Sequence, residues 1–168
     1  MMRRLILMRH AKSSWADGGQ ADIDRPLNKR GRNAAASIGV WLKARGYEPD
    51  VALVSSAART RETWEIISGG IGLRPAEFLE ALYLAGPEQI LKALRNAPDV
   101  GVVLMLGHQP GLGEAAARFL TEQPNDPDFA RHPTAATSVI DFEVDGWGDV
   151  DWGAGVLREF EIPRRLTG

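Results

Sequence analysis

The segment LILMRHAKS at residues 5–13 decides the fold of this chain. Its first four residues are apolar without a polar interruption, as in a strand that helices cover on both faces. Two similar runs follow, VALV at residues 51–54 and VVLML at residues 102–106. Apolar residues recur at helical spacing between these runs, and strands that alternate with helices are typical of βαβ units. The sequence therefore predicts an α/β fold with a mainly parallel central sheet.

The helical spacing is clearest at residues 34–42, 87–94 and 112–120, where Pro87 suits the first turn of a helix. The end of the chain differs, because apolar and acidic residues alternate at residues 140–144 and 159–162. That alternation predicts an antiparallel strand pair at the sheet edge, with Trp147 and Trp152 packed against it. We expect residues 1–168 to form a single domain, a three-layer α/β/α sandwich.

The composition narrows the class of protein. Hydrophobic residues make up 44% and charged residues 25% of the 168 residues, as in soluble globular proteins. The chain has no cysteine, which excludes disulfides and zinc–cysteine sites, and its net charge of −2 argues against nucleic acid as a partner. The apolar run before Arg9 is too short for a secretory signal. We expect a cytoplasmic protein with no membrane segment; its oligomeric state stays open, with a monomer preferred.

Polar residues follow each predicted strand of the parallel sheet. Arg9 and His10 follow the first, Arg59 lies shortly after the second, and His108 follows the late one. Ligands of such sheets bind beyond the carboxyl ends of the strands, so these side chains should converge. A neutral imidazole is nucleophilic, and arginine presents a rigid fork to phosphate oxygens. The residue types therefore suit phosphoryl transfer, and no metal-ligand spacing such as H-E-x-x-H is present.

Four blocks of the sequence resemble motifs of the histidine phosphatase superfamily, whose fold is phosphoglycerate-mutase-like. They look especially like those of its SixA-type phosphohistidine phosphatases. The blocks are RHAKS at residues 9–13, DRPLNKRG at 24–31, SSAARTRET at 55–63 and GHQP at 107–110. The resemblance extends over residues 5–162. It implies that His10 is the nucleophile, that Arg9, Arg59 and His108 bind the phosphate, and that neither a metal nor another cofactor takes part.

Two positions depart from the superfamily pattern. Ala11 replaces a glycine, so we expect the turn after His10 to keep a negative φ. Ser56 stands where proline is usual, and its hydroxyl is a candidate cap for the helix that carries Arg59. Neither change removes a predicted phosphate ligand.

Several assignments remain open between a functional and a structural role. Glu80, after a predicted third strand, is the candidate general acid, although an ordinary surface or capping glutamate is the preferred interpretation. Ser13 and Arg25 are candidates for substrate binding; the alternatives are a turn serine and a solvated arginine. Arg61 is the alternative to Arg59 as the second arginine that binds phosphate. Outside the site, the sequence predicts a surface loop at residues 123–133 that exposes His132, and Asp17, Asp22 and Asp24 as loop and cap residues.

The expected reaction is removal of phosphate from phosphohistidine on a partner protein, through a covalent phosphohistidine at His10. Two alternatives remain. A small phosphoester is the substrate if the chain is a phosphomonoesterase or a mutase. A non-catalytic phosphate-binding module is the alternative outside enzymes.

Overall fold

The computed structural model describes residues 1–167, and its centre is a six-stranded sheet of order β3-β2-β4-β1-β5-β6. Strands β1, β2, β3 and β4 pair in parallel, and β5 runs antiparallel to both β1 and β6. This arrangement confirms the predicted parallel sheet and the antiparallel pair at its edge. The strands are β1 (Met2–Arg9), β2 (Val51–Ser55), β3 (Ala76–Leu79), β4 (Val102–Gly107), β5 (Thr137–Glu143) and β6 (Val156–Glu161).

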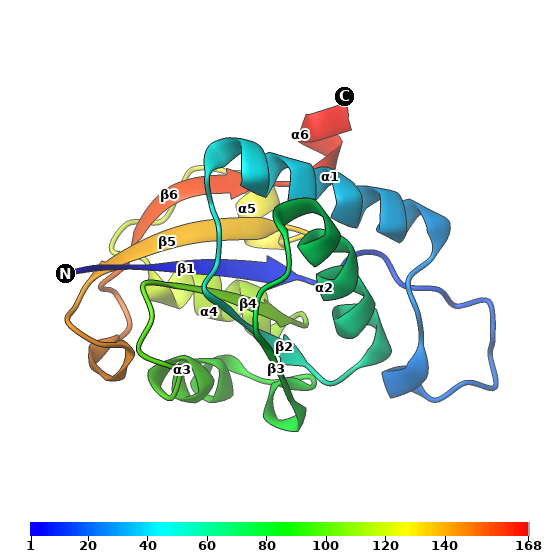
Figure 1. The fold of residues 1–168 in the computed structure, drawn as a ribbon, viewed down its shortest axis with the longest axis horizontal. Helices are drawn as coiled ribbons and strands as arrows, with labels where there is room; N and C mark the ends of the chain where they lie inside the picture. The colour runs from blue at the N-terminus through cyan, green and yellow to red at the C-terminus, as the bar shows by residue number, and fades with distance from the viewer. Residues whose placement is uncertain (168) are drawn as a thin grey trace.

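Helices cover both faces of the sheet, which confirms the predicted three layers (Figure 1). One face carries α1 (Lys29–Arg45) and α2 (Ala58–Ile71). The other carries α3 (Pro87–Arg95), α4 (Gly111–Phe119) and α5 (Pro127–Arg131). The C-terminal helix α6 (Pro163–Thr167) lies against α1. Three short 3-10 helices complete the elements: η1 (Asp22–Asp24), η2 (Glu80–Leu82) and η3 (Trp147–Asp149).

The central strand β1 explains the uninterrupted apolar run. Leu5 and Leu7 pack into the core beneath α3 and α4, whereas Ile6 and Met8 pack into the core beneath α1 and α2. All four side chains have no exposed surface. Because successive side chains of a strand point to opposite faces, only a strand with two covered faces needs apolar residues at every position.

The start of α1 fixes the loop that follows β1. Asn28 caps the helix by accepting a hydrogen bond from the Gly31 backbone N–H at 2.8 Å. Gly31 packs so tightly on that loop that a Cβ atom would lie 2.1 Å from the Lys12 carbonyl oxygen. The motif glycine is therefore needed for a close approach of two backbone segments. This contact holds the loop after His10 against a rigid helix.

The structure differs from the prediction in the C-terminal third of the chain. Residues 123–133 were predicted to form a surface loop, but they contain the helix α5. His132 was expected at the surface, but it is fully buried against the rings of Phe129 and Phe160. Of the two tryptophans predicted to pack on the strand pair, Trp147 is 2% exposed, and Trp152 lies 4.7 Å from Phe119 of α4 between ring centroids. Within residues 1–167, every helix is too short or too polar to cross a membrane.

Candidate active site

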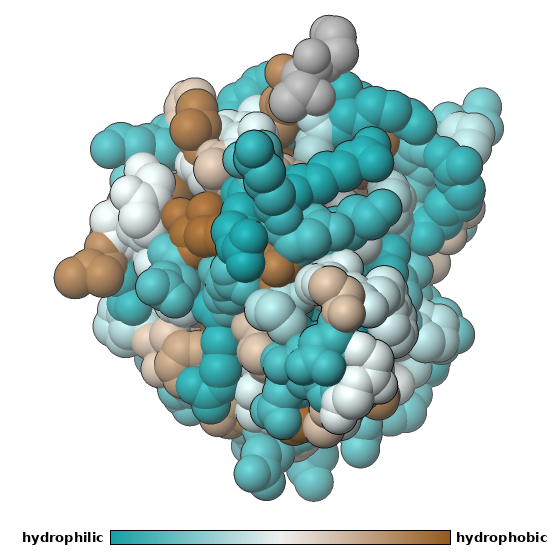
Figure 2. Space-filling model, turned by 90° about the vertical axis from the view of Figure 1, so that its right-hand side faces the viewer, coloured by the Kyte–Doolittle hydropathy of each residue, from teal (hydrophilic) through white to brown (hydrophobic). Residues whose placement is uncertain are grey.

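The carboxyl ends of β1, β2 and β4 meet at a cavity of about 470 Å³. Figure 2 shows this end of the molecule, where hydrophilic side chains dominate the surface. The structure brings together all predicted site residues except Glu80. The residues that line the cavity are Arg9, His10, Lys12, Ser13, Trp15, Asp22, Arg25, Arg59, Leu84, His108, Gln109 and Thr134.

His10 lies directly beyond β1, and its backbone N–H continues the strand ladder by donating to the Gly107 carbonyl at 3.1 Å. The ring is 7% exposed, and its Nδ1 lies 2.6 Å from the Ala11 carbonyl oxygen. Since a carbonyl only accepts hydrogen bonds, Nδ1 carries the proton and Nε2 keeps its lone pair. Ala11 has a negative φ, as predicted, and its N–H donates to Thr63 Oγ1 at 3.1 Å. The local backbone therefore selects the tautomer that a nucleophile needs.

The surroundings of His10 keep its imidazole uncharged. Its pKa is lowered to about 3, chiefly by burial; the backbone hydrogen bond with Ala11 raises the pKa, and the neighbouring His108, Arg59 and Arg9 lower it. Near neutral pH this side chain consequently exists as the free base.

His108 faces His10 across the cavity, with 5.4 Å between ring centroids. Its Nε2 lies 2.7 Å from Ser55 Oγ, and that oxygen also accepts the Ala57 N–H at 3.4 Å. When the Ser55 hydroxyl donates its hydrogen to Nε2, the ring proton of His108 is on Nδ1. Nδ1 is buried without a hydrogen-bond partner. Burial, together with the charge of Arg59, lowers the pKa of His108 to about 4.

The two predicted arginines reach the cavity from different elements. Arg9 ends β1 and donates from Nη1 to the His132 carbonyl at 3.1 Å, so buried His132 orients it. Arg59 lies in the first turn of α2 and is 2% exposed. The Nε atoms of both are buried without partners. Arg61, the alternative to Arg59, points outward and lies 4.2 Å over the Phe78 ring.

Burial, with the nearby charge of Arg59, lowers the pKa of Arg9. Two guanidinium groups that repel each other at one cavity, and whose Nε donors lack partners, form an environment that an anion stabilises.

Sequence reasoning missed Asp22, which it assigned to a loop. The Asp22 carboxylate accepts hydrogen bonds from Arg59 Nη2 at 3.0 Å, from Arg25 Nε at 3.1 Å and from the Tyr83 hydroxyl. The Tyr83 bond above all, then those from Arg59 and Arg25, lowers its pKa to about 2. Asp22 is therefore ionised, and it holds Arg25 and Arg59 in place at the cavity. Its spacing of three residues from Arg25 was the one signal in the sequence.

Arg25 and Ser13 line the cavity and contact each other. Arg25 Nη1 donates to Ser13 Oγ at 2.8 Å, and its guanidinium stacks 3.6 Å from the centre of the Trp15 ring. Arg25 is only 7% exposed, which contrasts with the alternative of a solvated arginine.

Two predictions about the site concern residues that do not line it. Glu80 is exposed at the start of η2 and lies outside the cavity lining, which gives its role as general acid no geometric support. Ser56 does not cap α2: the cap position is Ala57, and Ser56 Oγ is buried without a partner. In residues 1–167, no three His, Asp or Glu side chains are grouped to hold a metal ion.

Comparison with known proteins places this geometry in a family. The model of the histidine phosphatase superfamily (branch 1) matches residues 5–83. The structure of the putative phosphohistidine phosphatase SixA from Nakamurella multipartitia is 31% identical, with a TM-score of 0.82 over 97% of both chains. The chain belongs to the histidine phosphatase superfamily.

Further relatives are similar to nearly the whole chain. An uncharacterized protein of Mycobacterium tuberculosis is 36% identical over 94% of this chain and 100% of its own. The phosphohistidine phosphatase SixA of Escherichia coli is 28% identical over 89% of this chain and 91% of its own. The similarity to the SixA proteins supports a phosphatase.

Proposed function

We propose that this histidine phosphatase removes phosphate from phosphohistidine on a partner protein, and that His10 carries the phosphoryl group between two steps. The observation that carries the proposal is the neutral His10 ring, whose Nδ1 hydrogen is held by the Ala11 carbonyl at 2.6 Å. The His10 Nε2 atom therefore keeps the lone pair that acts as the nucleophile. Three residues that line the same cavity each have a buried nitrogen atom without a hydrogen-bond partner: Arg9 Nε, Arg59 Nε and His108 Nδ1.

In the first step, His10 Nε2 attacks phosphorus in line with the bond to the leaving nitrogen. The new Nε2–P bond forms as the old P–N bond breaks, and the electron pair of that bond stays on the leaving imidazole. That imidazole departs neutral when its other ring nitrogen is already protonated. The enzyme needs no further proton at this step.

In the second step, water attacks the phosphorus of the His10 intermediate. The Nε2–P bond breaks, its electron pair returns to Nε2, and both protons of the water end on inorganic phosphate. Arg9, Arg59 and His108 stabilise the three equatorial oxygens in both steps, since most of this catalysis is electrostatic. Arg59 is held for this task by Asp22, with 2.8 Å between Arg59 Nη1 and the Asp22 carbonyl.

The acid–base character of the cavity favours a nitrogen leaving group. An alkoxide needs a proton as it leaves, but Asp22, the carboxyl group that lines the cavity, is ionised because its pKa is lowered to about 2. Glu80 lies outside the cavity lining. This supports phosphohistidine over small phosphoesters as the preferred substrate. The presence of His10 itself argues against a non-catalytic phosphate-binding module.

The proposal is tested by comparing kcat/KM for a phosphohistidine peptide with kcat/KM for phosphoglycerate and a sugar phosphate. We expect the peptide to be the better substrate by at least about a hundredfold, the scale on which general acid catalysis contributes. Equal or higher values for the phosphoesters would replace the proposed substrate class by a small-molecule one.

A further inference from the structure

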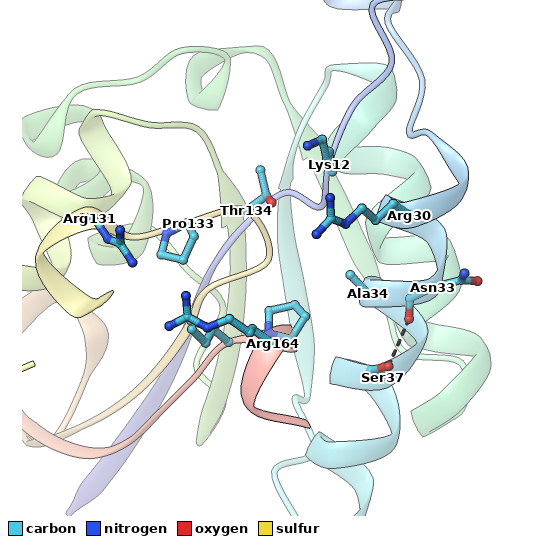
Figure 3. A pocket seen from close by; sticks show the side chains of 11 residues that line it. Lys12, Arg30, Asn33, Ala34, Ser37, Arg131, Pro133, Thr134 and Arg164 are labelled. Carbon is cyan, nitrogen blue, oxygen red and sulfur yellow. Dashed lines mark hydrogen bonds between the residues drawn. The ribbon is translucent and has the colours of Figure 1, made fainter. Parts of the chain in front are cut away.

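A second cavity of about 420 Å³ lies beside the first, between the start of α1, the loop after α5 and the start of α6. Figure 3 shows Lys12 and Arg30 on one side of it and Arg131 and Arg164 on the other. The volume lies within the range of small-ligand pockets. No acidic side chain lines it in the described part of the chain. We call it the basic cavity.

The charges of the basic cavity are not balanced within the protein. Arg131 and Arg164 share one carboxylate, that of Asp128, with 2.6 Å between Arg164 Nη2 and Asp128 Oδ2. Arg30 and Lys12 are exposed and make no side-chain ion pair within residues 1–167. Four cations therefore line the basic cavity, and the one carboxylate that pairs with them is shared. The electrostatic potential of the basic cavity is consequently positive.

The helix beside the basic cavity adds to this potential. The first turn of α1 has no acidic residue, although Asp and Glu stabilise that end of a helix. It carries Lys29, Arg30 and Arg32 instead, of which Arg32 pairs with Glu62 at 2.7 Å. Positive side chains at the positive end of a helix are unfavourable for folding. Their presence at this position favours an anionic ligand.

The basic cavity is continuous with the proposed phosphoryl site. Lys12 and Thr134 line both cavities, and Lys12 follows His10 by two residues. Arg131 precedes His132, whose carbonyl accepts from Arg9. When the phosphoryl group of a substrate lies at His10, the shared residues Lys12 and Thr134 therefore place the basic cavity next to the rest of that substrate.

We propose that the basic cavity is an anion subsite that binds a second negatively charged group of the substrate, while the phosphoryl group occupies the cavity at His10. The group is a carboxylate or a phosphate. In a protein substrate it is the side chain of an acidic residue that flanks the phosphohistidine. This inference rests on the proposed function for the identity of the first group and extends it to what surrounds that group.

The test uses two phosphohistidine peptides of otherwise identical sequence. In the acidic peptide Asp residues flank the phosphohistidine, and in the neutral peptide Asn residues do. A second pair, 3-phosphoglycerate and glycerol 3-phosphate, differs by a carboxylate on a small phosphoester. For each pair, kcat/KM is measured with the full chain, Arg30→Gln, Arg164→Gln and the control Lys43→Gln. Lys43 is an exposed cation at the far end of the same helix. The Kd values of the unphosphorylated Asp and Asn peptides are measured as well, so that binding is read without chemistry.

We expect the wild-type chain to prefer the acidic peptide, and Arg30→Gln to lower the preference by about fivefold, as for one exposed ion pair of about 1 kcal/mol. Arg164→Gln should act similarly and Lys43→Gln should leave the preference intact. A preference confined to the small phosphoesters assigns the second anion to a small molecule. The preference should shrink as salt screens the charges.

The subsite is overturned if the acidic and neutral members of both pairs behave alike, or if Arg30→Gln and Arg164→Gln retain the full preference. The proposed function fails differently. In that case the chain does not turn over phosphohistidine, yet the acidic peptide still binds more tightly than the neutral one and the two arginine variants still lose the difference.

Discussion

At the scale of single residues, a nucleophilic histidine needs a lone pair on the nitrogen that faces its substrate. The Ala11 carbonyl supplies this condition by fixing the proton on Nδ1 of His10, and burial keeps a second proton away. The residue types at this position are readable from the sequence. The tautomer is not, because it depends on a 2.6 Å contact with a neighbouring carbonyl.

The protonation state of His10 gives the first prediction. Its pKa is lowered from 6.5 to about 3, so the ring should remain the neutral Nδ1–H tautomer from pH 8 down to pH 5. Nitrogen-15 NMR of labelled protein distinguishes the two ring nitrogens and follows their titration. A titration midpoint near 6.5, or a proton on Nε2, would contradict the proposed geometry.

The two neighbouring arginines of α2 give the second prediction. Arg59→Ala should lower kcat by about 10² to 10³, by analogy with the loss of one donor to a developing oxyanion. The matched control is Arg61→Ala. It removes the same charge from a side chain that lies two residues further along the helix and points outward. The assignment of Arg59 fails if its removal costs less than about fivefold or if Arg61→Ala costs more.

At the scale of elements, the strands and the helices α1, α3 and α4 follow from the sequence because each depends on local periodicity, whereas α5 lies in a segment predicted to be a loop. Asp22 and His132 were misplaced for a different reason. Asp22 acquires its role from Arg59 and Tyr83, and His132 is buried by Phe129 and Phe160, all contacts that the folded chain creates. Residues on irregular segments carry no periodicity from which such contacts can be read.

The contact between α1 and the loop after His10 gives the third prediction. Gly31→Ala places a Cβ atom 2.1 Å from the Lys12 carbonyl oxygen, so the helix and the loop must separate. We expect a loss of about 1–3 kcal/mol in unfolding free energy, as for other overpacked sites, together with lower activity. The measurement is denaturant unfolding, followed by kcat/KM.

The control for Gly31→Ala is Gly69→Ala in α2, where a Cβ atom meets nothing within 4 Å. There the change should stabilise the protein by about 0.8–1.0 kcal/mol through helix propensity. If both substitutions behave alike, the motif glycine is not needed for a close approach of the two backbones.

At the scale of the whole molecule, the buried histidines link folding to pH. The pKa values of His10 and His108 are lowered to about 3 and about 4, while those of the unfolded chain stay near 6.5. Below pH 6.5 the unfolded chain binds protons that the folded chain does not, so the free energy of unfolding falls as pH falls. This stability is fully present above that pH.

The fourth prediction is the size of that effect. From pH 7 to pH 5, each of the two histidines should remove about 2 kcal/mol of unfolding free energy. Denaturant unfolding at both pH values measures the change, and His108→Gln should remove its share of the pH dependence. A free energy of unfolding that does not change over this range would show that the histidines are not buried as neutral groups.

The most direct test of the account is acid-labile phosphate on His10. Protein mixed with a phosphohistidine peptide and quenched within one turnover should yield, by mass spectrometry under conditions that preserve phosphohistidine, one added phosphoryl group on the peptide that contains His10. His10→Ala should carry none and show no turnover. Turnover by His10→Ala, or a phosphoryl group on another residue, would contradict the proposal that the ring beyond β1 is the nucleophile.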